Sequence, residues 1–169
     1  QVQQDTNRDT AIFNKDKKFA VRYESLNSTS KKGNIHFYLS GSAGYKSASI
    51  SDVNIFDSNM GTLLIERENS VDDITKDNVY KLQYRRNRKD RIQVSKSASI
   101  SINGSTESSY NAAWTGSSTV EFGNSFGTIA GAPALWGSVQ PMSGSIQEIR
   151  YWAEQLKDIV IDEHTLSRE

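Results

Sequence analysis

The sequence predicts an all-β fold, a sandwich of two antiparallel sheets with a short helix near its C-terminal end. Short runs rich in β-branched and aromatic residues recur at intervals of about ten residues, and clusters of Gly, Ser, Asn and Asp separate them. No long stretch with helical spacing alternates with these runs, which argues against a parallel α/β sheet. The 169 residues are enough for one domain with a self-sufficient core.

Each predicted strand is a β-type run bounded by turn residues. The expected strands are Phe19–Tyr23, Ile35–Ser40, Ser51–Phe56, Gly61–Glu66, Val79–Tyr84, Arg91–Val94, Ser97–Ile102, Thr119–Gly123 and Ile146–Trp152. Residues 1–18 are polar apart from one apolar triplet, so we expect an N-terminal arm or a first edge strand there. The domain proper is then residues 19–169.

Turn signals separate the runs. Asn103-Gly104 is the strongest short hairpin signal, because both residues tolerate positive φ, and it predicts a hairpin after Ile102. The polar stretch RRNRKD at 85–90 is expected to form a hairpin tip, and 66–78 a loop or one helical turn. Residues 127–139, which contain Pro133 and Trp136, are expected to form a long ordered loop.

The C-terminal residues predict a closing strand followed by a helix. Ile146, Ile149 and Tyr151 are expected to face inward, with a bulge at 147–148 that absorbs their irregular spacing. Asp158 suits the N-cap or first turn of a helix over 159–166. We expect this helix to close the open end of the sandwich.

The hexapeptide KSASIS occurs twice, at 46–51 and at 96–101. The flanking residues do not match, whereas a true duplication would extend into them. We therefore interpret both copies as Ser-rich strands whose small residues face solvent. In the second copy Ala98, Ile100 and Ile102 share one face.

Three motifs, in order, carry a resemblance to a known family. ISING at 100–104 resembles the strand and Asn-Gly turn of laminin G-like domains, and TVEFGNSFG at 119–127 resembles their next strand. SGSIQEIRYWAEQLKDIVIDEH at 143–164 resembles their closing strand and short helix. The resemblance covers about the last 70 residues, and before residue 95 only the strand positions fit.

This resemblance implies a concanavalin A-like jelly roll. It also implies a module like those on phage tail and capsid proteins and on the surface proteins of large DNA viruses. The expected localisation is therefore extracellular or on the virion surface. The expected partners are a glycan or glycosylated host surface and neighbouring subunits of a larger assembly.

Composition excludes several classes. There are no cysteines, so neither disulfides nor a Cys-based metal site can form. Twenty basic and twenty acidic residues give zero net charge, which argues against nucleic acid as a partner. No apolar run approaches the ~20 residues of a membrane span.

Acidic residues do not predict catalysis. Glycan-cleaving enzymes of this fold class place several acids on one groove-facing strand, whereas here Glu66 and Glu68 lack the third acid and suit a solvated strand end. We predict no catalytic residue and no cofactor. The resemblance allows calcium, and two acidic clusters could supply oxygen ligands or could be solvated loops. The clusters are Asp52, Asn54 and Asp57, and Asp72, Asp73 and Asp77.

A basic run is the first candidate binding element. Five cations within seven positions give a local positive field that suits phosphate or sulfated glycan. The same run could instead be a charged hairpin tip that discourages edge pairing. The candidates for an anionic ligand are Arg85, Arg86, Arg88, Lys89 and Arg91.

Aromatic residues near turns are the second candidate. Sugar rings stack on Trp and Tyr, and nearby polar groups bind the hydroxyls, although each ring could instead cover the end of the core. The candidates for a glycan site are Tyr45, Asn103, Tyr110, Trp114 and Trp136.

Together these observations predict a non-catalytic binding module that recognises a glycan or cell surface. The alternative is a purely structural domain that packs against other subunits or decorates a viral particle or fibre. A groove with exposed Trp114 or Trp136 would favour the first, and a large apolar patch outside the sandwich would favour the second.

Overall fold

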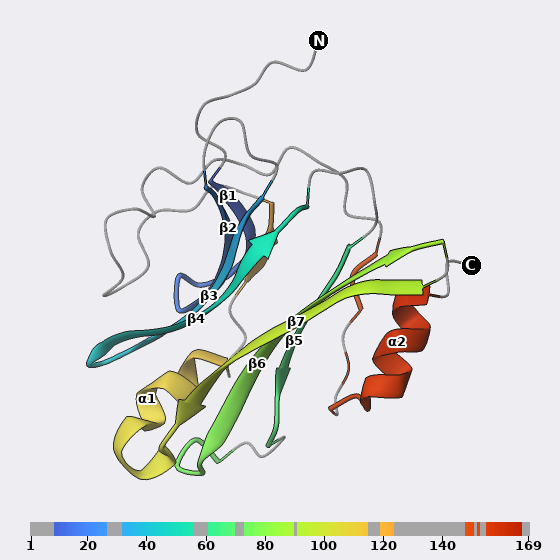
Figure 1. Cartoon of the computed structure of the whole chain (residues 1–169). Coiled ribbons are helices and arrows are strands. Elements are labelled where there is room, and N and C mark those ends of the chain that lie inside the picture. Colours follow the sequence, from blue (N-terminus) through green and yellow to red (C-terminus); the bar gives the residue numbers. More distant parts are fainter. Residues whose placement is uncertain are drawn as a thin grey trace.

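The computed structural model describes residues 9–26, 32–55, 61–69, 73–89, 91–114, 119–123, 148–150, 152 and 155–166. These residues form two antiparallel sheets and two helices (Figure 1). The five-stranded sheet has the order β4-β3-β2-β1-β8, and the three-stranded sheet has the order β5-β6-β7. The first sheet comprises β1 (Thr10–Lys15), β2 (Phe19–Ser25), β3 (Gly33–Gly41), β4 (Gly44–Val53) and β8 (Val120–Phe122). The second comprises β5 (Gly61–Arg67), β6 (Asn78–Arg88) and β7 (Arg91–Ile102).

The predicted all-β sandwich with a C-terminal helix is confirmed. Within the described residues, hairpins join β1 to β2, β2 to β3, β3 to β4, and β6 to β7, while β8 returns to pair with β1. The segment Thr10–Lys15 thus lies between β2 and β8 instead of forming an arm or an edge strand. The jelly-roll connectivity stays a prediction, since residues 124–147 lie outside the described part of the chain.

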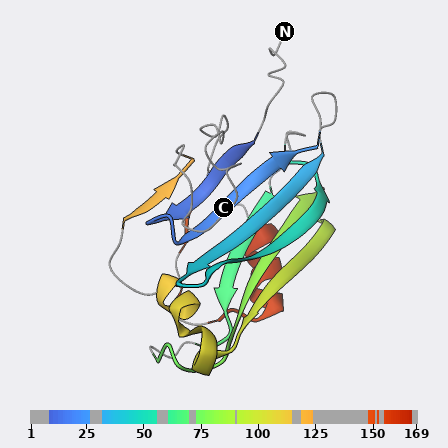
Figure 2. The ribbon, with the colours of Figure 1, turned by 90° about the vertical axis from the view of Figure 1, so that its left-hand side faces the viewer.

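The core lies between the two sheets, which Figure 2 shows from the side of the five-stranded sheet. Strand alternation turns Ile35, Phe37 and Leu39 of β3 inward, where they meet Tyr80 and Leu82 of β6, and none of these side chains exceeds 1% exposure. Because alternate residues point outward, the same strands present their other residues on the outer faces of the sandwich.

The two KSASIS copies lie in β4 and β7, the neighbouring edge strands of the two sheets. Lys46 Nζ donates a hydrogen bond to the carbonyl of Ser101 at 3.2 Å, and Lys96 Nζ donates to the carbonyl of Ser51 at 2.8 Å. Each lysine therefore binds the last serine of the other copy. The predicted outward orientation of the serines is confirmed, but the sequence comparison did not indicate that the copies bind one another.

The helix α1 (Gly104–Trp114) covers one end of the sandwich, between β3 and β7 (Figure 1). The predicted Asn103-Gly104 hairpin is wrong, because Asn103 instead caps this helix: its Oδ1 accepts from the Ser105 amide at 3.1 Å, and its own amide donates to the Glu107 carboxylate at 3.0 Å. Gly104 is required there, since a Cβ would lie 2.3 Å from the backbone of Thr75 and Lys76.

The helix α2 (Asp158–Leu166) forms where the sequence predicts a helix, but it does not close an end of the sandwich. It lies on the side of the three-stranded sheet that faces away from the other sheet (Figure 1). Ile161 is buried as expected. Ile149, predicted to face inward, is 56% exposed, and residues 148–150 and 152 are not in a strand. Ile146 and Tyr151 lie outside the described residues.

Two strand boundaries also differ from the predictions. The strand β4 runs without a break from Gly44 to Val53, whereas the sequence predicted a Ser-rich strand at 46–51 and a further strand at 51–56. The strand β6 continues through Arg88, which pairs with Arg91, so most of the predicted hairpin tip is strand. In β4 the Lys and Ser residues hide the alternation, and the end of β6, Arg85–Arg88, has no apolar residue on either face.

Replacing Lys96 tests the contact between the two edge strands. Lys96→Met keeps the aliphatic stem but removes the hydrogen bonds to the carbonyls of Ser51 and Asp52. We expect the free energy of unfolding to fall by about 1 kcal/mol, because the ammonium is partly solvated. Urea denaturation should show a lower midpoint with an unchanged slope.

The control is Lys89→Met at the exposed tip of the β6–β7 hairpin. A surface change of this kind should alter the free energy of unfolding by less than about 0.5 kcal/mol. Equal midpoints for Lys96→Met and the wild-type chain would contradict a stabilising role of the lysine.

Candidate functional site

The outer face of the five-stranded sheet carries the most connected group of polar and aromatic side chains among the described residues. Its members come from three neighbouring strands, where the register places Arg22 of β2 opposite His36 of β3, and His36 opposite Ser49 of β4. We call this group the outer-sheet site. It consists of Arg22, Glu24, His36, Tyr38, Tyr45 and Ser49.

An aromatic row runs along this face. The ring centroid of Tyr38 lies 5.8 Å from that of Tyr45 and 6.0 Å from that of His36. Tyr45 is 37% exposed, whereas Tyr38 is almost fully buried. Burial raises the pKa of Tyr38 above its ordinary value.

His36 joins two side chains on either side of it. Its Nε2 lies 2.8 Å from Glu24 Oε2, and its Nδ1 lies 2.7 Å from Ser49 Oγ. Because an ionised carboxylate only accepts hydrogen bonds, Nε2 carries the proton, and in the neutral ring Nδ1 accepts from the Ser49 hydroxyl. These bonds fix the orientation of the imidazole on the sheet surface.

Glu24 is the partly accessible charge of this group. Burial raises the pKa of Glu24, but hydrogen bonds from His36 and from Asn34, at 3.2 Å, outweigh burial and hold the pKa below its ordinary value. The Glu24 side chain is therefore an ionised carboxylate at neutral pH. About a third of its side chain (32%) is accessible to solvent.

Arg22 is 2% exposed, although it lies on the outer face. Its guanidinium lies between two carboxylates, with Nη1 3.4 Å from Asp9 Oδ2 and Nη2 3.5 Å from Glu24 Oε1. Asp9 is itself held by the Ser25 amide at 3.1 Å. The positive charge of Arg22 is therefore enclosed by protein groups.

The residues that the sequence offered for a glycan site lie in different parts of the structure. Tyr45 is exposed within the outer-sheet site. Tyr110 is buried, and Trp114 packs 4.9 Å from the ring of Phe19 and 5.4 Å from that of Tyr80, so the predicted glycan role of these two residues is replaced by a place in the core. Asn103 is the cap of α1. Trp136 lies outside the described residues.

The residues of the basic run differ in burial, because most of them lie on the strand β6 and at its end. Arg85 is buried and binds the carboxylates of Asp158 and Asp162 on α2, so the structure excludes it as a binding residue for an external anion. Arg86 is half-buried. Arg88, Lys89 and Arg91 are exposed at the hairpin end, where an anion site stays a prediction.

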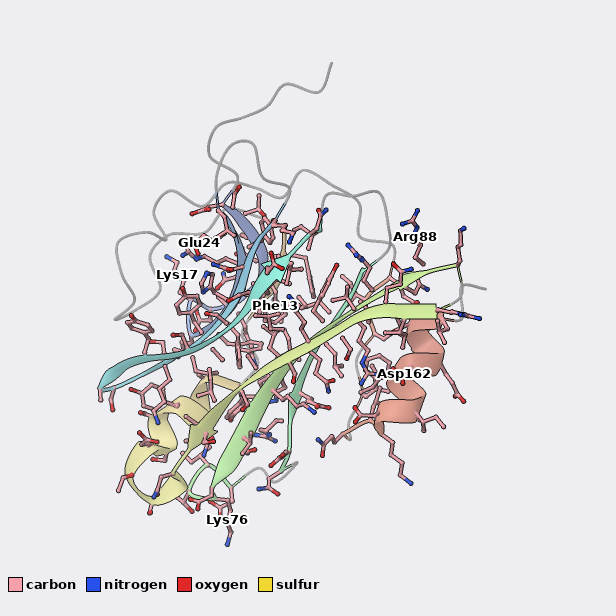
Figure 3. The ribbon with its side chains drawn as sticks, viewed as in Figure 1. Phe13, Lys17, Glu24, Lys76, Arg88 and Asp162 are labelled. Atoms are coloured by element: carbon pink, nitrogen blue, oxygen red, sulfur yellow. The ribbon has the colours of Figure 1, made fainter. Side chains whose placement is uncertain are left out.

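Figure 3 shows the two candidate regions on opposite sides of the molecule. Glu24 lies beside the five-stranded sheet, whereas Asp162 lies on α2 on the far side of the three-stranded sheet and Arg88 lies at the end of the β6–β7 hairpin.

Four of the acidic residues that the sequence singled out accept hydrogen bonds within the described part of the chain. Asp73 binds the Thr75 amide and hydroxyl, Asp77 binds the Gly104 amide at 2.9 Å, and Asp52 binds Lys32. Glu66 is buried and binds Gln83 at 2.7 Å. Within the described residues, no group of three or more His, Asp or Glu side chains could hold a metal ion, and Asp57 and Asp72 lie outside them.

Sequence reasoning missed most of the outer-sheet site. His36 lies within the predicted strand Ile35–Ser40, and both of its ring nitrogens are bonded. The missed signal is the alternation of polar residues in FAVRYES and NIHFYLS, which puts Arg22 and Glu24 on the same face as His36 and Tyr38.

Comparisons of this chain with protein-family models, with curated proteins and with solved structures find no match. The likeness to laminin G-like domains therefore rests on the sequence motifs alone and stays a prediction. In the described part of the chain, neither helix has the length or the apolar character to cross a membrane.

The attachment of α2 can be tested through Arg85. Arg85→Met removes the ion pairs to Asp158 and Asp162 and the bond to the Asp158 carbonyl. We expect faster hydrogen exchange over 158–166 and a loss of about 1–3 kcal/mol in the free energy of unfolding.

Arg88→Met is the matched control, because Arg88 is exposed on the same strand. It should leave exchange in α2 unchanged. Full protection of α2 in Arg85→Met would show that other contacts hold the helix.

Proposed function

We propose that this chain is a non-catalytic binding module that recognises a glycan on the outer face of its five-stranded sheet. The observation that carries the proposal is the exposed ring of Tyr45 beside Tyr38, on the same face as the hydrogen-bonding groups of Glu24, His36 and Ser49. An exposed aromatic ring offers an apolar surface to the C–H face of a sugar. The neighbouring polar groups would bind its hydroxyls.

The open form of this surface supports a glycan more than a small enclosed ligand. Small-molecule sites are concave and mostly apolar, whereas the outer-sheet site lies on a sheet surface bordered by exposed serines of β4. A sheet surface of this kind can contact several units of an extended chain. The predicted extracellular or virion-surface localisation, with a glycosylated host surface as partner, belongs to the same proposal.

The alternative is a structural domain that packs against neighbouring subunits. Val120 and Phe122 of β8 are 42% and 40% exposed, and β8 is an edge strand of the described sheet. Exposed apolar residues on an edge favour association with another chain. Sedimentation of the wild-type chain and of Phe122→Asp would test this alternative, which requires a dimer or larger assembly that the substitution dissociates.

Replacing Tyr45 tests the binding module. Tyr45→Ala should abolish or strongly weaken retention on a glycan array, and it should leave the melting temperature nearly unchanged because the ring is exposed. The array should be run with calcium and with a chelator, which tests calcium dependence in the same experiment.

Trp114→Ala serves as the contrasting variant. Its ring packs against Phe19 and Tyr80, so its removal should lower the free energy of unfolding by about 3 kcal/mol. A blank array for the wild-type chain in both conditions would contradict the glycan proposal and favour the structural alternative.

A further inference from the structure

The charge of the outer-sheet site limits the kind of glycan that it can bind. The site contains one cation, Arg22, and one carboxylate, Glu24, and the carboxylate of Asp9 lies beside Arg22. Arg22 is enclosed, whereas about a third of the Glu24 side chain reaches solvent. Of the charges of Arg22 and Glu24, the accessible one is therefore the negative charge of Glu24, and the exposed Lys32 just before β3 is paired with Asp52 at 2.8 Å.

An anionic sugar would be disfavoured at this surface for two reasons. Its carboxylate or sulfate could not reach the guanidinium of Arg22 without displacing Asp9 or Glu24. Like charges placed side by side at a binding surface also cost free energy. Arg88, one exposed cation that would suit such a ligand, lies away from Glu24 at the end of the β6–β7 hairpin (Figure 3).

A cationic sugar would find two complementary groups. An ammonium group is attracted both by a carboxylate and by the face of a tyrosine ring, and the outer-sheet site has Glu24 and the exposed Tyr45. Glu24 stays ionised at neutral pH because His36 and Asn34 donate to it.

The spacing of these groups indicates the size of the ligand. Tyr45 pairs with Ser40, and Ser40 is four residues from His36 along β3. Four residues of a strand span about 13 Å. A ligand that contacts both Tyr45 and the Glu24–His36 pair must therefore be an oligosaccharide and not a single sugar.

We propose that the outer-sheet site selects oligosaccharides that carry free amino groups, with Tyr45 stacking on one sugar and Glu24 binding the ammonium group of another. This inference rests on the proposed glycan-binding function and adds the chemical class of the ligand. It assigns Glu24 as the residue that determines specificity and Tyr45 as the residue that supplies general affinity.

The test compares three ligands of equal length: glucosamine oligomers, their N-acetylated counterparts and uronic acid oligomers. Titration of the full chain by calorimetry at neutral pH and low salt should give the tightest binding for the glucosamine oligomers. We expect about tenfold tighter binding for the amino form than for the acetylated form, and no binding of the uronic acid form.

Glu24→Gln should remove this preference, so that amino and acetylated oligomers bind within about twofold of each other. Glu121→Gln is the matched control, because it removes one carboxylate from the same outer face at β8, where Glu121 binds Asn14. This control should retain the preference. The acetylated ligand removes the charge without changing the protein, so the test does not depend on the stability of Glu24→Gln.

Four results would overturn the inference. Uronic acid oligomers that bind as tightly as the amino form would contradict the charge argument, and an unchanged preference in Glu24→Gln would contradict the role of Glu24. If neutral oligomers bind, Tyr45→Ala abolishes that binding, and the amino form binds no tighter, the inference is overturned but the proposed glycan-binding function stands. If no saccharide of any class binds, the proposed function falls together with it.

Discussion

The two-residue period of the β-strand is the constraint on which the rest of this structure depends. Each strand that turns one apolar row toward the other sheet must turn its alternate row outward. In β3 the inward row is Ile35, Phe37 and Leu39, and the same backbone therefore places His36 and Tyr38 on the outer face. The core thus fixes the positions of the outer-sheet site without contributing any atom to it.

Polar contacts help to join the two sheets at the β4–β7 edge and to attach the helices to them. The edge strands β4 and β7 meet through two lysines whose stems lie on the inner side and whose ammonium groups bind the backbone of the opposite strand. The helix α1 covers one end with Tyr110 and Trp114, and α2 is held on the outer face of the three-stranded sheet by Arg85 and Asn87. The cations and aromatic rings in these contacts stabilise the fold. For this reason Arg85, Tyr110 and Trp114, which the sequence offered as ligand-binding candidates, contact other parts of the chain instead.

The outer-sheet site differs from these packing contacts, because its internal hydrogen bonds and ion pairs leave some of its side chains accessible to solvent. Arg22 is neutralised by Asp9 and Glu24, and His36 is oriented by Glu24 and Ser49, yet Tyr45 and part of Glu24 still face solvent. A surface whose groups are already held in position loses little conformational entropy when a ligand binds. This fixed arrangement is the physical basis for the binding role that we propose.

The sequence by itself determined the all-β class, most strand positions and the C-terminal helix, because alternation, turn residues and capping residues act locally. It could not place the ends of the elements when local signals conflicted: Asn103-Gly104 suits a hairpin, but the contacts of Tyr110 and Trp114 with the core favour a helix. Only the tertiary structure decided which aromatic rings are buried, that the two KSASIS strands bind one another, and that Arg22, Glu24 and His36 meet. These contacts join residues far apart in the chain, and their pairing depends on sheet register and packing, which no local pattern specifies.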